Sequence, residues 1–140
     1  MRLIAMMLVL CSGISFATTK HAPLPDSVYR AKTVYIINQS GFQSTADGAY
    51  DALTKWGVFT VVSDKTKADL LLTFTYEGDE LVNGTSRWGN FDMVVKLPGT
   101  DDTVFTASSG GGGLHMPSAR GGVAAKDCVN QFKRRVQEPH

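Results

Sequence analysis

Hydrophobic residues in the first half of the chain follow a strand, helix, strand pattern. The run 33–37 is rich in β-branched and aromatic residues and is apolar on both faces, as is typical of an interior strand. The run 58–62 is a second β-branched segment, and residues 44–57 between the two have helical periodicity. A helix between two strands favours a right-handed crossover that joins parallel neighbours, so the sequence predicts one βαβ unit.

The helix predicted between those strands has both a start and a stop signal. Ser44 and Asp47 form an S-x-x-D pair, which can satisfy free backbone N–H groups where a helix begins. Gly57 suits the left-handed conformation that ends many helices. The apolar positions recur at three- and four-residue spacing and are Ala46, Ala49, Tyr50 and Leu53, with Trp56 in the last turn. We therefore expect this face to pack on the sheet.

The second half of the chain predicts three further strands. Residues 69–76 resume a strand with Leu70, Leu72, Phe74 and Tyr76 on one face. Residues 78–90 have turn signals and predict a long loop, after which alternation over 91–97 predicts a strand with one covered face. The turn residues 98–102 precede a short strand at 103–108, so a hairpin is expected with its last strand at or near an edge.

Four consecutive glycines, Gly110 to Gly113, follow that strand. They look at first like a phosphate cradle, because glycine lets backbone N–H groups approach an anion closely. The Gly-Lys-Ser or Gly-Lys-Thr ending of a phosphate loop is missing, since the next lysine is Lys126. Four glycines also have large backbone entropy in the free chain. The sequence therefore predicts a mobile connector, or a segment that orders on a partner.

The chain closes with an amphipathic helix predicted over residues 121–138. Its apolar stripe follows at four-residue steps and consists of Ala124, Cys128, Phe132 and Val136, flanked by Ala125 and Val129. This stripe is expected to face the sheet. It makes Cys128 a buried, inert thiol. Three basic residues at 133–135 complement the negative end of the helix dipole.

Together these elements predict an α/β fold on the border of α+β. The expected architecture is a two-layer sandwich with a five-stranded mixed sheet in the order 2-1-3-4-5, comprising the βαβ unit, a β-meander and a C-terminal helix. A chain of 140 residues with 43% hydrophobic content is enough for one domain, which we place at residues 32–138. The formal net charge of +1 and the scattered basic residues argue against a nucleic-acid partner.

The first residues predict export. Residues 1–17 match a secretory signal peptide, with Arg2 before the apolar run 3–10 and small residues ending at Ala17, after which we place the cleavage. The apolar run is shorter than the roughly 20 residues that span a bilayer, so no transmembrane segment is expected after signal removal. Residues 18–31 contain two prolines and predict an extended, mobile leader. The mature protein is expected in the periplasm or outside the cell.

Cys11 leaves an alternative open, an outer-membrane lipoprotein anchored through this residue. Lipoprotein signals usually have a small residue just before the modified cysteine, whereas Leu10 stands there, so the soluble form is favoured. If the signal is removed, Cys128 is the remaining cysteine and no intramolecular disulfide can form.

Candidate catalytic chemistry is sparse. His21 and His140 lie in expected tails, which leaves His115 beside the glycine run, and an enzyme would have Asp101, Asp102 and His115 as its candidate residues. A nucleophilic site needs a base and an orienting carboxylate, and a metal site needs several converging ligands. No spacing predicts either. We therefore assign no catalytic, cofactor-binding or metal residue, expect no cofactor, and predict that the protein is not an enzyme.

A resemblance to known envelope domains supports the same fold. It rests on the order of elements across residues 32–136, and chiefly on two stretches, Lys55-Trp56-Gly57-Val58-Phe59-Thr60-Val61-Val62 and Ala68-Asp69-Leu70-Leu71-Leu72. In these the chain resembles the amino-terminal domain of TolB and the curli-secretion lipoprotein family. The resemblance implies a mixed-sheet α/β sandwich in the cell envelope that engages other proteins. It implies no activity, and no family site residue transfers to this chain. A very short connection between the second and third strands departs from the family and argues against pore formation.

The function predicted from the sequence is a non-catalytic secreted or periplasmic envelope protein that binds another protein or an envelope component. The alternative is a small hydrolase or ligand-binding enzyme that uses the loops around His115. The oligomeric state and the identity of the partner are left open.

Overall fold

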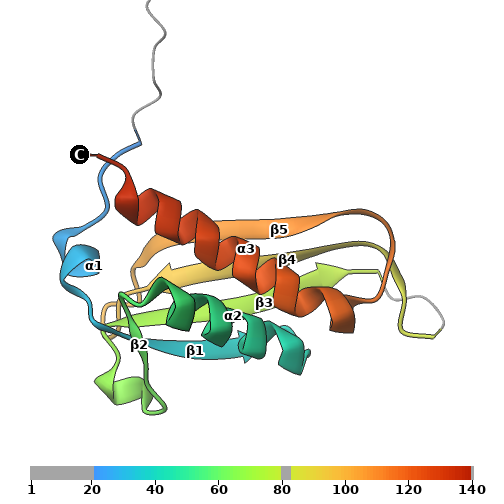
Figure 1. The fold of residues 1–140 in the computed structure, drawn as a ribbon, viewed down its shortest axis with the longest axis horizontal. Helices are drawn as coiled ribbons and strands as arrows, with labels where there is room; N and C mark the ends of the chain where they lie inside the picture. Colours follow the sequence, from blue (N-terminus) through green and yellow to red (C-terminus); the bar gives the residue numbers. More distant parts are fainter. Residues whose placement is uncertain (1–20, 80–82, 140) are drawn as a thin grey trace, which may run out of the picture.

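The computed structural model describes residues 21–79 and 83–139 (Figure 1). The helices and strands are, in chain order, α1 (Asp26–Arg30), β1 (Thr33–Gln39), α2 (Gln43–Trp56), β2 (Thr60–Val61), the 3-10 helix η1 (Lys65–Lys67), β3 (Leu70–Gly78), β4 (Ser86–Lys96), β5 (Thr103–His115) and α3 (Pro117–Gln137). The predicted signal peptide at 1–17 lies outside the described residues. Within the described ranges, no helix has the length and apolar character needed to cross a membrane.

The five strands form one open mixed sheet in the order β2-β1-β3-β4-β5. Strand β1 is parallel to both β2 and β3, whereas β4 pairs antiparallel with β3 and β5. Helices α2 and α3 lie together on one face of this sheet (Figure 1). The predicted fold class, the βαβ unit, the meander and the strand order are confirmed.

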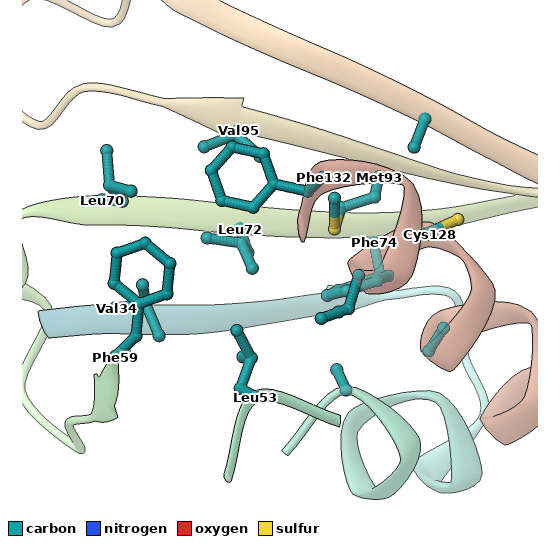
Figure 2. Packing of buried hydrophobic residues seen from close by; sticks show 14 of the residues in the cluster. Val34, Leu53, Phe59, Leu70, Leu72, Phe74, Met93, Val95, Cys128 and Phe132 are labelled. Atoms are coloured by element: carbon teal, nitrogen blue, oxygen red, sulfur yellow. The ribbon is translucent and has the colours of Figure 1, made fainter. Parts of the chain in front are cut away.

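The core lies between the sheet and the helices (Figure 2). Alternate residues of the central strands point into it, among them Val34, Leu70, Leu72, Phe74, Met93 and Val95. From α3, Phe132 is fully buried and its ring contacts three others, with centroid distances of 5.8 Å to Trp56, 6.1 Å to Phe59 and 5.2 Å to Phe105. The predicted apolar stripe of the closing helix therefore faces the sheet as expected.

The segment before β1 belongs to the core rather than to a leader. Residues 26–30 form α1, and Leu24, Val28 and Ala31 are all buried in the hydrophobic cluster. Pro25 stands just before the helix, where a missing backbone N–H does no harm. The prediction of an extended, mobile leader is wrong for these residues, because their apolar side chains at three- and four-residue spacing cover one end of the core.

Helix α2 begins differently from the prediction and ends as predicted. Its N-cap is Phe42, with no side-chain cap, and Ser44 Oγ instead donates to the carbonyl of Ser118 in α3 at 2.6 Å. The S-x-x-D pair therefore does not form the expected cap, because the Ser44 hydroxyl is hydrogen-bonded to a carbonyl of the neighbouring helix. Gly57 has the expected left-handed conformation (φ 76°), and its N–H donates to the Leu53 carbonyl at 3.1 Å.

Helices α2 and α3 approach each other closely at two glycines. A Cβ on Gly48 would lie 2.2 Å from the Gly122 carbonyl oxygen, closer than atoms can pack. At an exposed position inside a helix, a Gly→Ala change usually raises the free energy of unfolding by about 1 kcal/mol. We expect Gly48→Ala instead to lower the free energy of unfolding by about 1–3 kcal/mol, because the helices must move apart. Urea unfolding measures this.

Gly122→Ala is the matched control for that prediction. A Cβ there would meet its nearest atom, the Ser44 carbonyl oxygen, at 3.0 Å, so a smaller loss is expected. Stabilisation by both alanines would show that the helices do not touch at this point.

The glycine run is part of a strand. Strand β5 continues past residue 108 to His115, and the register pairs Asn90 with Gly110, Gly89 with Gly111 and Trp88 with Gly112. The predicted mobile connector is therefore wrong, as is the predicted loop over residues 86–90, which form the start of β4. Two physical reasons explain why the glycine run is an ordered strand. Cross-strand pairing fixes the glycine backbone, and a Cβ on Gly110 would lie 2.1 Å from Asn90 Oδ1, so only glycine fits there.

The closing helix also starts earlier than predicted. Helix α3 begins at Pro117 rather than at residue 121, directly after β5. Proline suits the first helical turn, since its fixed φ is already helical and its N–H is not needed. The strand and helix are thus joined by Met116 alone, with no glycine linker between them.

Candidate functional site

The three candidate catalytic residues do not come together. Asp101 and Asp102 lie in the turn before β5, whereas His115 is its last residue, and a strand of this length spans roughly 40 Å. Asp101 Oδ1 pairs with Lys96 Nζ at 3.3 Å. Across the described ranges, no group of three or more His, Cys, Asp or Glu side chains could hold a metal ion. The structure thus separates the base from the carboxylates that a hydrolase built on these residues would need.

His115 does lie opposite a hydroxyl residue, Ser86, in the β4–β5 register. Ser86 is almost fully buried, at 2% exposure, and its Oγ accepts a hydrogen bond from Tyr76 Oη at 3.0 Å. Tyr76 is itself held in place, because its ring packs against Phe42 and Phe91 with centroids 5.3 and 4.7 Å away. The serine hydroxyl is therefore part of an aromatic packing cluster and is poorly placed to attack a substrate.

A cavity of about 540 Å³ opens beside this aromatic cluster. It is lined by Phe42, Tyr76, Glu77, Gly78, Gly84, Ser86 and Pro117. Gly78 and Gly89 leave room for the tyrosine, since a Cβ on either would lie within 2.4 Å of Tyr76 Oη. The packing of the Tyr76 ring thus explains why both positions are glycine.

Cys128 is buried and unsuited to nucleophilic chemistry. Burial, with smaller effects from Asp127 and Asp92, raises the pKa of its thiol to about 12. Since the thiolate is the reactive form, the group stays neutral and inert near neutral pH. The prediction of a buried thiol is confirmed.

A labelling experiment tests the state of this thiol. In a Cys11→Ser variant, which leaves Cys128 as the one cysteine of the sequence, we expect a maleimide to react very slowly while the protein is folded and rapidly after unfolding in denaturant. Mass spectrometry detects the label. Fast labelling of the folded chain would mean that the thiol is accessible and ionised.

Strand β5 is the long outer strand of the sheet. It has 13 residues and ends the strand order, whereas strands are usually about 5–6 residues long. Exposed edges are normally protected by lysine, proline or a covering segment, because their free N–H and C=O groups can pair with another strand. From residue 103 to 114, β5 contains neither a charged residue nor proline. Gln131 Nε2 of α3 donates to the Ser108 carbonyl at 2.8 Å, which satisfies one carbonyl of the strand.

Two exposed apolar side chains flank the glycine end of this strand. Trp88 is 48% exposed and lies opposite Gly112, and Met116, which follows β5 directly, is 52% exposed. We call β5 together with Trp88 and Met116 the β5 edge surface. Tryptophan is enriched among residues that dominate binding energy at protein interfaces. Sequence reasoning missed Trp88 because its polar neighbours made residues 78–90 resemble a loop.

Comparison with known proteins identifies the fold and no family. No protein-family model matches the chain, and a search of curated proteins found no match. Among solved structures, the PelC dodecamer from Paraburkholderia phytofirmans has a TM-score of 0.51 at 12% identity, over 78% of this chain and 89% of that chain. A single-residue variant of the same dodecamer has a TM-score of 0.52 at 13% identity, covering 77% and 89%.

A minor lipoprotein from Acinetobacter baumannii has a TM-score of 0.46 at 11% identity, over 75% of this chain and 90% of that chain. At the identities found for PelC, the likeness shows the fold alone. The resemblance to TolB and the curli-secretion family stays a prediction.

Proposed function

We propose that this chain is an exported, non-catalytic protein of the cell envelope that acts by binding protein, and that its β5 edge surface pairs with a second copy of the chain. The observation behind the proposal is the unprotected outer strand. Residues 103 to 114 of this strand are small or uncharged, so a second backbone can pair with it outside Ser108, whose carbonyl accepts from Gln131. Pairing of this kind derives affinity from main-chain hydrogen bonds, with side-chain pockets adding specificity.

The likeness to PelC supports a second copy as the partner. The solved PelC structures are dodecamers, so this α/β fold is compatible with self-assembly. Pairing of β5 with β5 would give a two-fold dimer, whereas pairing of β5 with a different surface would give a ring or a filament. The mass of the particle distinguishes these arrangements.

A lysine placed on the edge tests the proposal. Thr106 is exposed on β5, and Thr106→Lys adds the kind of charge that natural edge strands use to prevent pairing. Thr54→Lys, at an exposed position of α2, is the matched control. Light scattering after size exclusion should show assembly of the unmodified chain and of Thr54→Lys, and a monomer for Thr106→Lys. A monomeric unmodified chain at high concentration would overturn the proposal.

Export is tested by the mass of the secreted protein. We expect the mature chain to begin at Thr18, because the pattern over residues 1–17 ends in small residues. Intact-mass measurement of exported material gives the cleavage point. A chain that begins at Cys11 with a diacylglyceryl adduct would replace the soluble form with the lipoprotein alternative.

A further inference from the structure

A basic cavity lies between α2 and α3, in the helix layer that covers the sheet. It has a volume of about 230 Å³ and is lined by Asp51, Ala52, Lys55, Trp56, Lys126, Asn130 and Lys133. Three lysines and one aspartate thus converge on one small cavity. None of these residues belongs to the β5 edge surface. Binding at this cavity therefore does not depend on pairing of β5 with a second copy.

One carboxylate serves two of the three lysines. Asp51 Oδ2 is 3.3 Å from Lys55 Nζ and 2.8 Å from Lys126 Nζ. Hydrogen bonds from Lys126 and then Lys55 hold the pKa of Asp51 below its usual range. The carboxylate is therefore ionised at neutral pH and keeps both ammonium groups at the cavity.

The third lysine leaves the cavity with an excess of positive charge. None of the ion pairs between described residues includes Lys133. Lys126, Asn130 and Lys133 follow one another at four- and three-residue steps of α3, so they lie along one side of the helix. With three ammonium groups and one carboxylate, the cavity carries a net charge of +2, and Lys133 is the lysine that has no ion pair among the described residues.

The remaining wall of the cavity is aromatic and is formed by Trp56. Trp56 contacts Phe59 and Phe132 edge to face at 5.0 and 5.8 Å, which fixes its ring. Its Nε1 is buried and has no hydrogen-bond partner in the part of the chain that the structure describes. Because Nε1 is closed off from solvent, it is not counted among the groups that bind a ligand, and Trp56 contributes a fixed ring to the cavity wall.

We propose that this cavity binds a phosphate group through Lys55, Lys126 and Lys133. Lysine is a common phosphate ligand and acts as a point charge, so three ammonium groups suit an anion whose oxygens face several directions. The Asn130 amide adds a neutral donor at the same wall. A phosphate competes with Asp51 for the lysines. Removal of the aspartate charge is therefore expected to raise the affinity for phosphate, whereas removal of a lysine charge lowers it.

Tryptophan fluorescence provides the measurement. The chain has two tryptophans, so Trp88→Phe leaves Trp56, which lines the cavity, as the sole reporter. This variant is titrated with inorganic phosphate at low ionic strength, with sodium chloride of equal ionic strength as the blank. In a second arm it is mixed with vesicles of phosphatidylglycerol and phosphatidylcholine, and with vesicles of phosphatidylcholine alone.

We expect a saturable change in Trp56 fluorescence. Lys133→Gln or Lys126→Gln should weaken binding about fivefold or more, as the loss of one nearby charge predicts. Asp51→Asn should tighten binding, because it frees the lysines from the competing carboxylate. Lys65→Gln, at an exposed position in η1, is the matched control and should leave the affinity unchanged.

The two arms separate the sources of the phosphate. A response to inorganic phosphate supports a soluble ligand, and a response confined to phosphatidylglycerol vesicles supports a lipid headgroup. The proposal is overturned if neither gives a saturable response, or if Lys133→Gln and Lys65→Gln respond alike. Because the titration needs no assembly, this outcome is independent of the β5 pairing.

Discussion

Phe132→Ala is expected to lower the free energy of unfolding by about 3–5 kcal/mol, as is usual for a buried phenylalanine truncated to alanine. Figure 2 shows the Phe132 side chain among the buried residues of the core. Its ring links α3 to the rings of Trp56, Phe59 and Phe105, so its removal leaves a cavity between the helices and the sheet. Urea unfolding with linear extrapolation gives the change.

Val123→Ala is the control for that measurement. Val123 lies on the same helix but is 70% exposed, so its truncation should change stability by no more than about 0.5 kcal/mol. A Phe132→Ala midpoint equal to that of the unmodified chain would mean that α3 is not docked through this ring.

The second large effect is expected at Trp88. If β5 pairs with a second copy, Trp88→Ala should weaken self-association about 30-fold or more, the equivalent of an interface residue that contributes at least about 2 kcal/mol. Its 48% exposure in the single chain means that the fold itself depends little on the ring. Sedimentation velocity over a concentration series measures the association constant, and the unfolding midpoint checks that the fold is kept.

Tyr50→Ala is the matched control, since this aromatic residue of α2 is 55% exposed and lies outside the β5 edge surface. It should associate like the unmodified chain. Equal losses for both variants would mean that general surface hydrophobicity, rather than the β5 edge, drives association.

Most of the fold followed from local patterns. The run 33–37 and the helical periodicity of residues 44–57 each fit a single period, so the βαβ unit and the strand order 2-1-3-4-5 could be predicted. Tyr50 is the exception in the helix, because it was expected on the face that packs on the sheet and is 55% exposed. The closing stripe through Phe132 was equally clear.

The errors arose where a distant segment decides the local structure. The glycines from Gly110 to Gly113 look mobile by themselves, and their order depends on pairing with residues 88–90 of β4. The expected cap at Ser44 was replaced by a bond to Ser118, and Leu24 and Val28 are helical or buried because they meet a core formed much later in the chain. Sequence periodicity does not reveal such partners.

The candidate sites were harder to predict than the fold. Trp88 stands among polar residues and glycines, and its exposure beside an outer strand becomes visible only with the β4–β5 register. Lys55 and Lys126 are far apart in sequence, and they meet because α2 and α3 approach each other where Gly48 faces Gly122. In both cases the position of an unremarkable residue depends on a long-range contact.

Hydrogen exchange of the β5 amides at low and high protein concentration tests the central claim most directly. If the β5 edge pairs with a second copy, amides in residues 103–115 should exchange more slowly at high concentration, while those inside β3 and β4 stay unchanged, since both strands already have neighbours on each side. Thr106→Lys should lose the concentration dependence. Particles that grow in mass while the β5 amides exchange at one constant rate would contradict the account.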